Sequence, residues 1–163
     1  MKCREEMLVE LLKERNFHVT TAESCTGGLI AATIINVSGA SAVLDQGLVT
    51  YSNEAKERLV CVQRKTLEAY GAVSPETAEE MARGAAASAG AEVGISSTGI
   101  AGPDGGTREK PVGLVYLGCF VQGNVKVKKC MFSGNRGEIR RQSVEAALDF
   151  ALDCLKQEKE KSD

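Results

Sequence analysis

Apolar residues recur along the chain with two spacings, one typical of helices and the other of strands. Near the start, Met7, Leu8, Leu11 and Leu12 share one face of a helix that Asn16 ends. Shorter apolar runs bounded by Gly, Ser or Asn indicate strands. In the first part of the chain these spacings predict, in order, a helix over 4–15, a strand over 17–22, a loop over 23–28, a buried helix over 29–35, a turn over 38–41, a strand over 44–51 and a helix over 52–60.

Local signals sharpen two of the helix starts. Ser52 or Asn53 is a candidate cap for the helix over 52–60, and Ser74 followed by Pro75 predicts a helix that runs to about residue 88. The run Q-G-N (122–124) is typical of a hairpin turn. The remaining pattern predicts a strand over 91–97, a glycine-rich loop over 99–106, strands over 112–120 and 124–132, a long amphipathic helix over 136–155 and a solvated polar tail over 156–163.

The order of these elements predicts the fold class. Strands and helices alternate at first, and a hairpin and a closing helix follow. We therefore expect an α/β protein with three α/β/α layers around a mixed sheet. No internal repeat is visible, so residues 1–163 are interpreted as a single domain with its core over about 4–155.

Composition narrows the class of function. A hydrophobic fraction of 43%, a charged fraction of 26% and a net charge of -2 are typical of a soluble globular protein. Only 4% of residues are aromatic and Trp is absent, which argues against nucleic-acid binding. The sequence has no apolar stretch near the roughly 18 residues of a membrane span and no signal-peptide core. The six cysteines lack C-x-x-C or zinc spacing, so we expect free thiols in a reducing cytoplasm and neither metal nor cofactor.

Charge is unevenly distributed along the chain. Between Arg108 and Arg141 eight basic residues stand against Glu109 and Glu138. A basic segment in an acidic protein suits a small anionic ligand better than a polyanion. An exposed hairpin that carries Lys126, Lys128 and Lys129 is an equally good explanation.

The candidate nucleophile is Ser24, at the junction between a strand and a helix. Gly27 and Gly28 allow close approach of a ligand, and helix-start N–H groups are suited to an oxyanion hole. Two alternatives stay open: Ser24 or Thr26 is merely a helix cap, or the neighbouring Cys25 is the nucleophile.

A general base is the second requirement. His18, the single histidine, falls in or near a strand and is more typical of a structural or surface residue. A serine without histidine can be activated by a desolvated lysine. Lys56, about one turn into a helix, and Tyr51, at the end of a strand, are expected at the same sheet edge as Ser24. The alternative for Lys56 is an ordinary solvated helix residue.

The loop that follows the strand over 91–97 is rich in glycine and contains Pro103. It is suited to cradle a phosphate or a substrate ring, but it has neither a P-loop ending nor a G-x-G-x-x-G fingerprint. Asp104 is interpreted as a turn residue rather than a ligand contact.

Five segments in this order, T-A-E-S-C-T-G-G, G-L-V-T-Y-S-N-E-A-K, G-A-V-S-P-E-T-A, S-T-G-I-A-G-P-D-G-G-x-x-x-K-P-V-G and F-S-G-N-R-G-E-I-R-R-Q-S-V, resemble the CinA C-terminal-domain family. The resemblance covers about residues 8–155. It implies a deamidase of nicotinamide mononucleotide (NMN) in its stand-alone form, since the chain has no room for the larger N-terminal domain of some members. It also suggests a homodimer.

The resemblance implies roles for particular residues. Ser24 would be the nucleophile, Lys56 the base, and Tyr51 would hold Lys56 or relay its proton, with no cofactor. Thr98 and Gly99 would line the ring or ribose, and Arg140 or Arg141 would pair with the 5′-phosphate. The expected substrate-binding residues are Cys25, Thr26, Gly27, Gly28, Asn53, Thr98, Gly99, Arg140 and Arg141.

Two other functions remain open from the sequence. One is a nucleotide-binding regulatory module in which Ser24 only caps a helix. The other is an amidase of a different carboxamide, such as free nicotinamide. An enzyme releases ammonia and a regulatory module does not. An NMN deamidase depends on the phosphate of its substrate, whereas an amidase of free nicotinamide does not.

Overall fold

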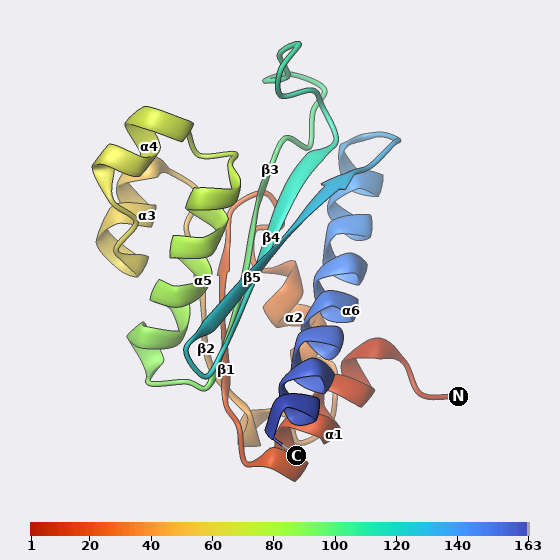
Figure 1. Ribbon diagram of the computed structural model, residues 1–163. Coiled ribbons are helices and arrows are strands. Elements are labelled where there is room, and N and C mark those ends of the chain that lie inside the picture. Colours follow the sequence, from red (N-terminus) through yellow and green to blue (C-terminus); the bar gives the residue numbers. More distant parts are fainter. Residues whose placement is uncertain (163) are drawn as a thin grey trace.

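A five-stranded mixed sheet forms the centre of the computed structural model, which describes residues 1–162 (Figure 1). The strand order is β2-β1-β3-β4-β5. β1 is parallel to β2 and β3, whereas β3–β4 and β4–β5 are antiparallel. The strands are β1 (Val19–Glu23), β2 (Leu44–Val49), β3 (Val93–Gly99), β4 (Leu114–Val121) and β5 (Asn124–Met131).

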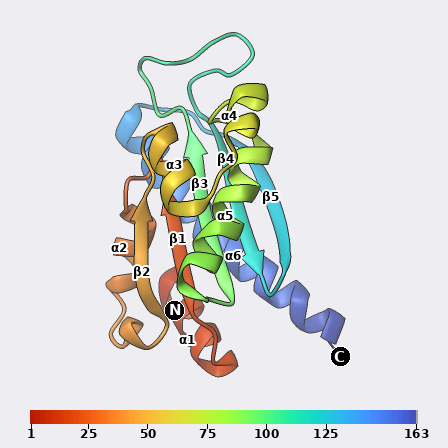
Figure 2. The ribbon, with the colours of Figure 1, turned by 90° about the vertical axis from the view of Figure 1, so that its left-hand side faces the viewer.

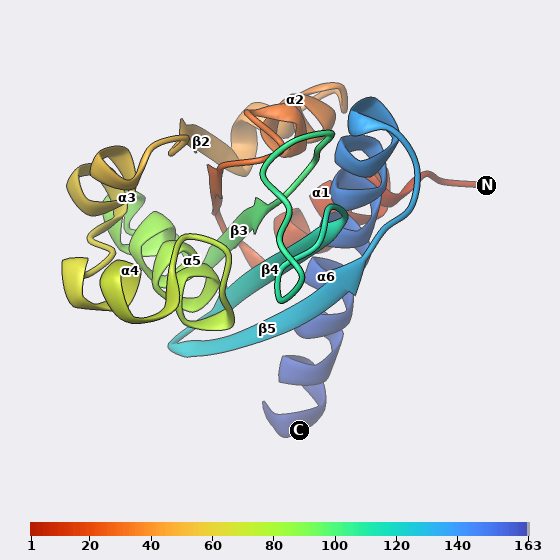
Figure 3. The same ribbon diagram turned by 90° about the horizontal axis from the view of Figure 1, so that it is seen from above.

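Helices cover both faces of the sheet, which confirms the predicted α/β/α layers (Figure 3). One face carries α1 (Arg4–Arg15), α2 (Leu29–Ile35) and α6 (Arg136–Ser162), and a 3-10 turn, η1 (Ala40–Ala42), leads into β2. The other face carries α3 (Asn53–Val60), α4 (Arg64–Tyr70) and α5 (Pro75–Ala89).

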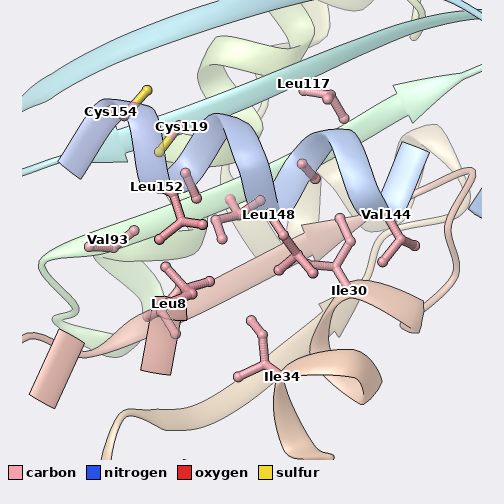
Figure 4. Packing of buried hydrophobic residues seen from close by; sticks show 14 of the residues in the cluster. Leu8, Ile30, Ile34, Val93, Leu117, Cys119, Val144, Leu148, Leu152 and Cys154 are labelled. Atoms are coloured by element: carbon pink, nitrogen blue, oxygen red, sulfur yellow. The ribbon is translucent and has the colours of Figure 1, made fainter. Parts of the chain in front are cut away.

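The face under α1, α2 and α6 is packed with large aliphatic side chains. Leu8, Ile30 and Leu148 meet there from three different helices, and all are at most 1% exposed (Figure 4). Burying side chains of this size contributes about 1.5–3 kcal/mol each. This layer holds the long C-terminal helix against the sheet.

The face under α5 is built from small residues. Ala78, Ala82 and Ala86 of α5 are fully buried, and a Cβ on Gly94 would collide with the Ala82 carbonyl oxygen. Ser96 of β3 donates from Oγ to the Ala78 carbonyl at 2.7 Å. Small residues on both surfaces therefore let the backbone of α5 approach the strands closely.

The predicted caps of two helices are confirmed. Ser52 accepts from the Ala55 N–H at 3.0 Å, so Ser52 and not Asn53 caps α3. Ser74 accepts from the Thr77 N–H at 3.2 Å, and Pro75 is the first residue of α5.

The structure differs from the predicted elements in one missed helix and in the ends of two elements. The sequence pattern did not predict α4, whose first turn is fixed by Glu80 of α5. The strand predicted over 44–51 ends at Val49, which leaves Tyr51 in the connection to α3. The predicted tail over 156–163 continues α6 as far as Ser162, and Asp163 lies outside the described residues.

Candidate active site

The three parallel strands end at the same edge of the sheet, where the loop over 100–113 projects (Figure 2). Ser24 follows β1, Thr50 and Tyr51 follow β2, and Gly99 ends β3. In open α/β sheets this edge is the usual position of a ligand site. The candidate residues from three separate segments are therefore brought together by the register of the parallel strands.

Ser24 and Lys56 contact each other directly. Lys56 Nζ lies 3.1 Å from Ser24 Oγ, and the two residues are 9% and 1% exposed. α3 turns Lys56 toward the sheet, so the alternative of a solvated helix lysine is wrong. Burial lowers the pKa of Lys56 below its usual 10.5, because desolvation disfavours the ammonium form.

Backbone carbonyls orient the amine of Lys56. Its Nζ donates to the Thr50 carbonyl at 2.8 Å and to the Tyr51 carbonyl at 3.5 Å. A neutral amine has two protons and one lone pair. With both protons on carbonyls, the lone pair is left to accept the Ser24 hydroxyl proton.

The turn after Ser24 exposes backbone donors. The Ser24 N–H donates to the Ser97 carbonyl at 2.9 Å and the Gly27 N–H to the Ser24 carbonyl at 3.1 Å. The N–H groups of Cys25 and Thr26 have no hydrogen-bond partner within residues 1–162. Of these two residues Cys25 lines a cavity at the site, so its N–H is placed for an oxyanion, whereas Thr26 is fully buried.

Neither Ser24 nor Thr26 caps the next helix. α2 begins after Gly28, which makes no side-chain cap bond. Its first N–H, from Leu29, donates to the Thr26 carbonyl at 3.1 Å, and the next two, from Ile30 and Ala31, donate to the Glu23 carboxylate at 2.8 and 3.1 Å. The alternative in which Ser24 serves only as a helix cap is therefore wrong.

Cys25 is poorly suited to be the nucleophile. Its side chain is 7% exposed, and burial raises the pKa of the thiol to about 11. The thiolate is the reactive form of cysteine, so this thiol is almost entirely protonated near neutral pH.

A cavity of about 190 Å³ lies beside this turn. Its lining residues come from the loop after β3, the turn after β1, the connection from β2 to α3 and the start of α6: Cys25, Tyr51, Gly99, Ile100, Ala101, Gly102, Asp104, Gly105 and Arg136. Ser24 and Lys56 line neither this cavity nor a larger one of about 690 Å³ between α2 and β2, which Gly28 lines. We assign the site to the smaller cavity because Cys25, next to Ser24, and Tyr51, whose carbonyl binds Lys56, both line it.

Arg136 is a site residue that the sequence analysis missed. It donates to the Gly102 carbonyl at 2.8 Å and to the Tyr51 hydroxyl at 3.4 Å. The available signal was its position four residues before Arg140, which predicts a shared helix face. Tyr51 contacts Lys56 through its carbonyl, whereas its exposed side chain faces Arg136.

The two arginines expected to bind phosphate have other partners. Arg140 donates from Nε to the Cys25 carbonyl at 3.0 Å and from Nη2 to the Thr26 carbonyl at 3.2 Å. Arg141 points elsewhere and pairs with Glu145 at 3.0 Å. Arg140 thus fixes the nucleophile turn, and the prediction for Arg141 is wrong.

Three other predicted binding residues, Thr98, Gly99 and Asn53, lie in different surroundings. The Thr98 hydroxyl is buried and donates to the Ala72 carbonyl at 2.7 Å, so its side chain does not face the cavity. Gly99 does line the cavity. Asn53 is exposed on the first turn of α3, and its contact with a ligand stays a prediction.

The basic excess between residues 108 and 141 does not form one patch. Lys110 donates to the Tyr70 carbonyl, Lys126 bonds to Gln157, and only Arg136 lines the cavity. His18 is at the opposite end of β1 from Ser24, with its side chain 46% exposed.

Two further features of residues 1–162 concern metal binding and membrane insertion. No group of three or more His, Cys, Asp or Glu residues in that part of the chain is placed to hold a metal ion. None of its helices combines the length and apolar character that crossing a bilayer requires.

Known proteins resemble this chain over nearly its whole length. The family model of the CinA C-terminal domain matches residues 2–155. A CinA-like protein of Kosmotoga olearia is 55% identical over 151 residues, which cover 93% of this chain and 37% of that protein. The chain thus spans about a third of the length of the curated relatives it matches.

Solved structures of similar length also match. The competence/damage inducible protein CihA of Agrobacterium tumefaciens is 42% identical with a TM-score of 0.88, and the match covers 96% of this chain and 98% of that one. A CinA superfamily protein of Klebsiella pneumoniae is 33% identical with a TM-score of 0.90, covering 96% and 99%. Neither name states a reaction.

Proposed function

The chain belongs to the CinA C-terminal domain family, and from this premise we propose that it is an amidohydrolase that deamidates NMN. The products are nicotinate mononucleotide and ammonia. The observation that carries the proposal is the buried contact of 3.1 Å between Lys56 Nζ and Ser24 Oγ. A lysine that is desolvated and shares a hydrogen bond with a serine is the arrangement that serine–lysine acyl transfer requires.

The first half of the proposed reaction forms an acyl-enzyme. Neutral Lys56 accepts the Ser24 proton as Oγ attacks the carboxamide carbon. The Thr50 and Tyr51 carbonyls retain the other two amine protons, so the resulting ammonium has three hydrogen-bond acceptors. Lys56 then donates a proton to the leaving nitrogen, and ammonia departs.

The second half releases the product. A water molecule, deprotonated by Lys56, attacks the acyl carbon, and Ser24 Oγ leaves with the proton. In both halves the carbonyl oxygen becomes an oxyanion. The N–H group of Cys25, which lines the cavity, is the proposed donor to it, and one such donor is typically worth about 3 kcal/mol of transition-state stabilisation.

The proposed ligand of the NMN phosphate is Arg136, and not Arg140 or Arg141 as the sequence suggested. Arg136 lines the cavity, and its partners are the carbonyl oxygen of Gly102 and the hydroxyl of Tyr51, both neutral. Its charge is therefore not balanced by either of them. A guanidinium is well suited to a phosphate, since it donates two parallel hydrogen bonds.

The test is an ammonia assay on the purified chain with three substrates: NMN, nicotinamide riboside and nicotinamide. We expect kcat/KM to fall about 10- to 150-fold without the phosphate, as for a charge-assisted contact. Arg136→Ala should remove this preference, whereas Arg141→Ala should preserve it. Equal kcat/KM for NMN and the riboside would refute the phosphate site.

Ser24→Ala is the control that separates an enzyme from a regulatory module. It should bind NMN but release no ammonia above about a thousandth of the parent rate. A parent chain that binds NMN and releases no ammonia would overturn the proposed function.

A further inference from the structure

Glu23 is a carboxylate at zero exposure immediately before the proposed nucleophile. It is the last residue of β1, and its side chain points to the face of the sheet that α2 covers. No step of the proposed mechanism uses it. A buried charge is expensive unless it is well hydrogen-bonded, so its partners indicate what it does.

Both oxygens of Glu23 accept N–H groups from the first turn of α2. Oε1 accepts from Ile30 at 2.8 Å and Oε2 from Ala31 at 3.1 Å. A negative charge at a helix N-terminus is favourable. Because each oxygen must accept, an isosteric amide cannot replace the carboxylate: its NH₂ would face one of these N–H donors.

The same carboxylate also orders a chain of hydroxyl groups. Thr26 Oγ1 donates its only proton to Glu23 Oε1 at 2.6 Å. The contact of 2.6 Å between Thr26 Oγ1 and Ser97 Oγ must therefore run from Ser97 to Thr26. Ser97 in turn accepts the Ser24 N–H on its carbonyl at 2.9 Å.

These bonds hold the nucleophile turn on both sides of Cys25. Ser24 is held through the backbone of Ser97, and Thr26 through its hydroxyl. The two unpartnered N–H groups, those of Cys25 and Thr26, belong to the peptides between these two anchors. Their direction is therefore constrained by these two anchors, of which Thr26 is bonded directly to Glu23, and by Arg140, which binds the Cys25 and Thr26 carbonyls.

We propose that Glu23 is a positioning residue of the serine chemistry, acting through Thr26 and Ser97 to aim Ser24 Oγ and the oxyanion donor. This inference rests on the proposed function and deepens it. Removal of the carboxylate leaves the substrate pocket in place but loosens the turn. A displacement of about 1 Å in such a turn costs on the order of a hundredfold in rate.

Glu80 provides a matched control within the same chain. It accepts one backbone N–H at the start of a helix, from Gln63 at 3.1 Å, where Glu23 accepts two, and one threonine hydroxyl, from Thr66 at 2.8 Å. That helix is α4, which contributes no residue to the site. Glu80→Gln therefore disturbs a carboxylate cap of the same kind without disturbing the nucleophile turn.

The experiment measures the reactivity of Ser24 without relying on NMN. A fluorophosphonate reacts with an activated serine: the Oγ–P bond forms, the P–F bond breaks, fluoride leaves, and the serine proton passes to Lys56. We expect Glu23→Gln to slow this labelling of Ser24 about ten- to a hundredfold, with Glu80→Gln at the parent rate. Labelling of Glu23→Gln at the parent rate would overturn the inference.

A second pair of variants covers the case in which Glu23→Gln does not fold. Thr26→Val breaks the link to the turn but leaves both N–H bonds of the α2 cap. It should lower the labelling rate and kcat about tenfold with little change in KM, and Thr26→Ser should restore most of the loss. A loss of melting temperature without a loss of kcat in Thr26→Val would show a structural role only.

These outcomes separate the two proposals. A parent chain that is labelled at Ser24 but does not hydrolyse NMN refutes the substrate, and the labelling ratio still decides the role of Glu23. A parent chain that is not labelled at all overturns both.

Discussion

The two faces of the sheet differ in the size of the side chains that pack on them. The face under α1, α2 and α6 is a continuous layer of large aliphatic side chains, among them Leu8, Ile30 and Leu148 (Figure 4). The face under α3 and α5 combines alanine and glycine with a smaller apolar cluster that includes Met81 and Val60, and it encloses Lys56 at 1% exposure.

This difference in side-chain size separates the residues that mainly stabilise the fold from those that take part in the proposed reaction. Large apolar side chains bury much area and bring most of the free energy of folding. Close packing of small residues buries less area, but it excludes water and fixes polar groups whose positions matter. On this view, changes to the aliphatic side chains under α6 alter the free energy of unfolding. Changes around Lys56, and at the polar residues Glu23 and Arg136 that reach the site from the other face, alter turnover.

The largest expected effect comes from Lys56. Lys56→Met and Lys56→Arg should each lower kcat by at least about a thousandfold, since neither side chain supplies a neutral amine. Lys56→Met should unfold close to the parent melting temperature, because it removes a costly buried amine. The measurement is steady-state kinetics beside thermal unfolding. An arginine variant with near-normal turnover would show that Lys56 supplies only charge.

The second prediction concerns the aliphatic face under α1, α2 and α6, where a substitution should alter stability and not turnover. Leu148→Ala should lower the free energy of unfolding by about 2–5 kcal/mol, through lost burial and the cavity left behind. Its kcat per folded molecule should stay within about twofold of the parent value. Denaturant titration and active-site labelling measure the two quantities. A kcat that falls together with stability would contradict the division between the faces.

A smaller effect tests the tight packing under α5. Gly94→Ala puts a methyl group against the Ala82 carbonyl and should cost about 1–3 kcal/mol of unfolding free energy, as overpacking does. Gly90→Ala gives the cost of backbone strain without overpacking, since φ at Gly90 is +60° but a Cβ there meets nothing within 4 Å. Equal stability of the Gly94→Ala and parent proteins would show that α5 has room to move.

The smallest effect is a pH dependence due to one group. The pKa of Lys56 is lower in the folded chain than the usual 10.5, so the unfolded chain binds more protons between those two values. Stability attributable to Lys56 therefore rises with pH across that window and becomes constant above it. The parent protein should gain stability relative to Lys56→Met as the pH rises through the range below 10.5. A constant difference across this range would mean that Lys56 is not desolvated.

Local sequence signals predicted the fold and placed Ser24 and Lys56 at the same edge of the sheet, and the family resemblance implied that the two residues act together. Ser74 and Pro75 mark a helix start by chemistry confined to a few neighbouring residues, and the ends of parallel strands necessarily meet at one edge. α4 was missed because its first turn is held by Glu80, which lies on another helix.

The errors at the site come from helix phase and side-chain direction. Arg136 and Arg140 lie one turn apart and both reach the site, whereas Arg141 is turned by about 100° and reaches Glu145. Thr98 and Gly99 are neighbours on one strand and thus face opposite sides of the sheet. A sequence pattern identifies such residues but not which of them turns inward.

The two bonds from Arg140 to the nucleophile turn join parts of the chain that are 115 and 114 residues apart. During synthesis Ser24 leaves the ribosome first, and the arginine that fixes its turn follows on the order of ten seconds later, at roughly 5–20 residues per second. The turn that carries Ser24 is therefore held by Arg140 only when the last helix has been made. An interrupted or truncated chain that contains Ser24 and Lys56 but ends before Arg140 lacks these two bonds.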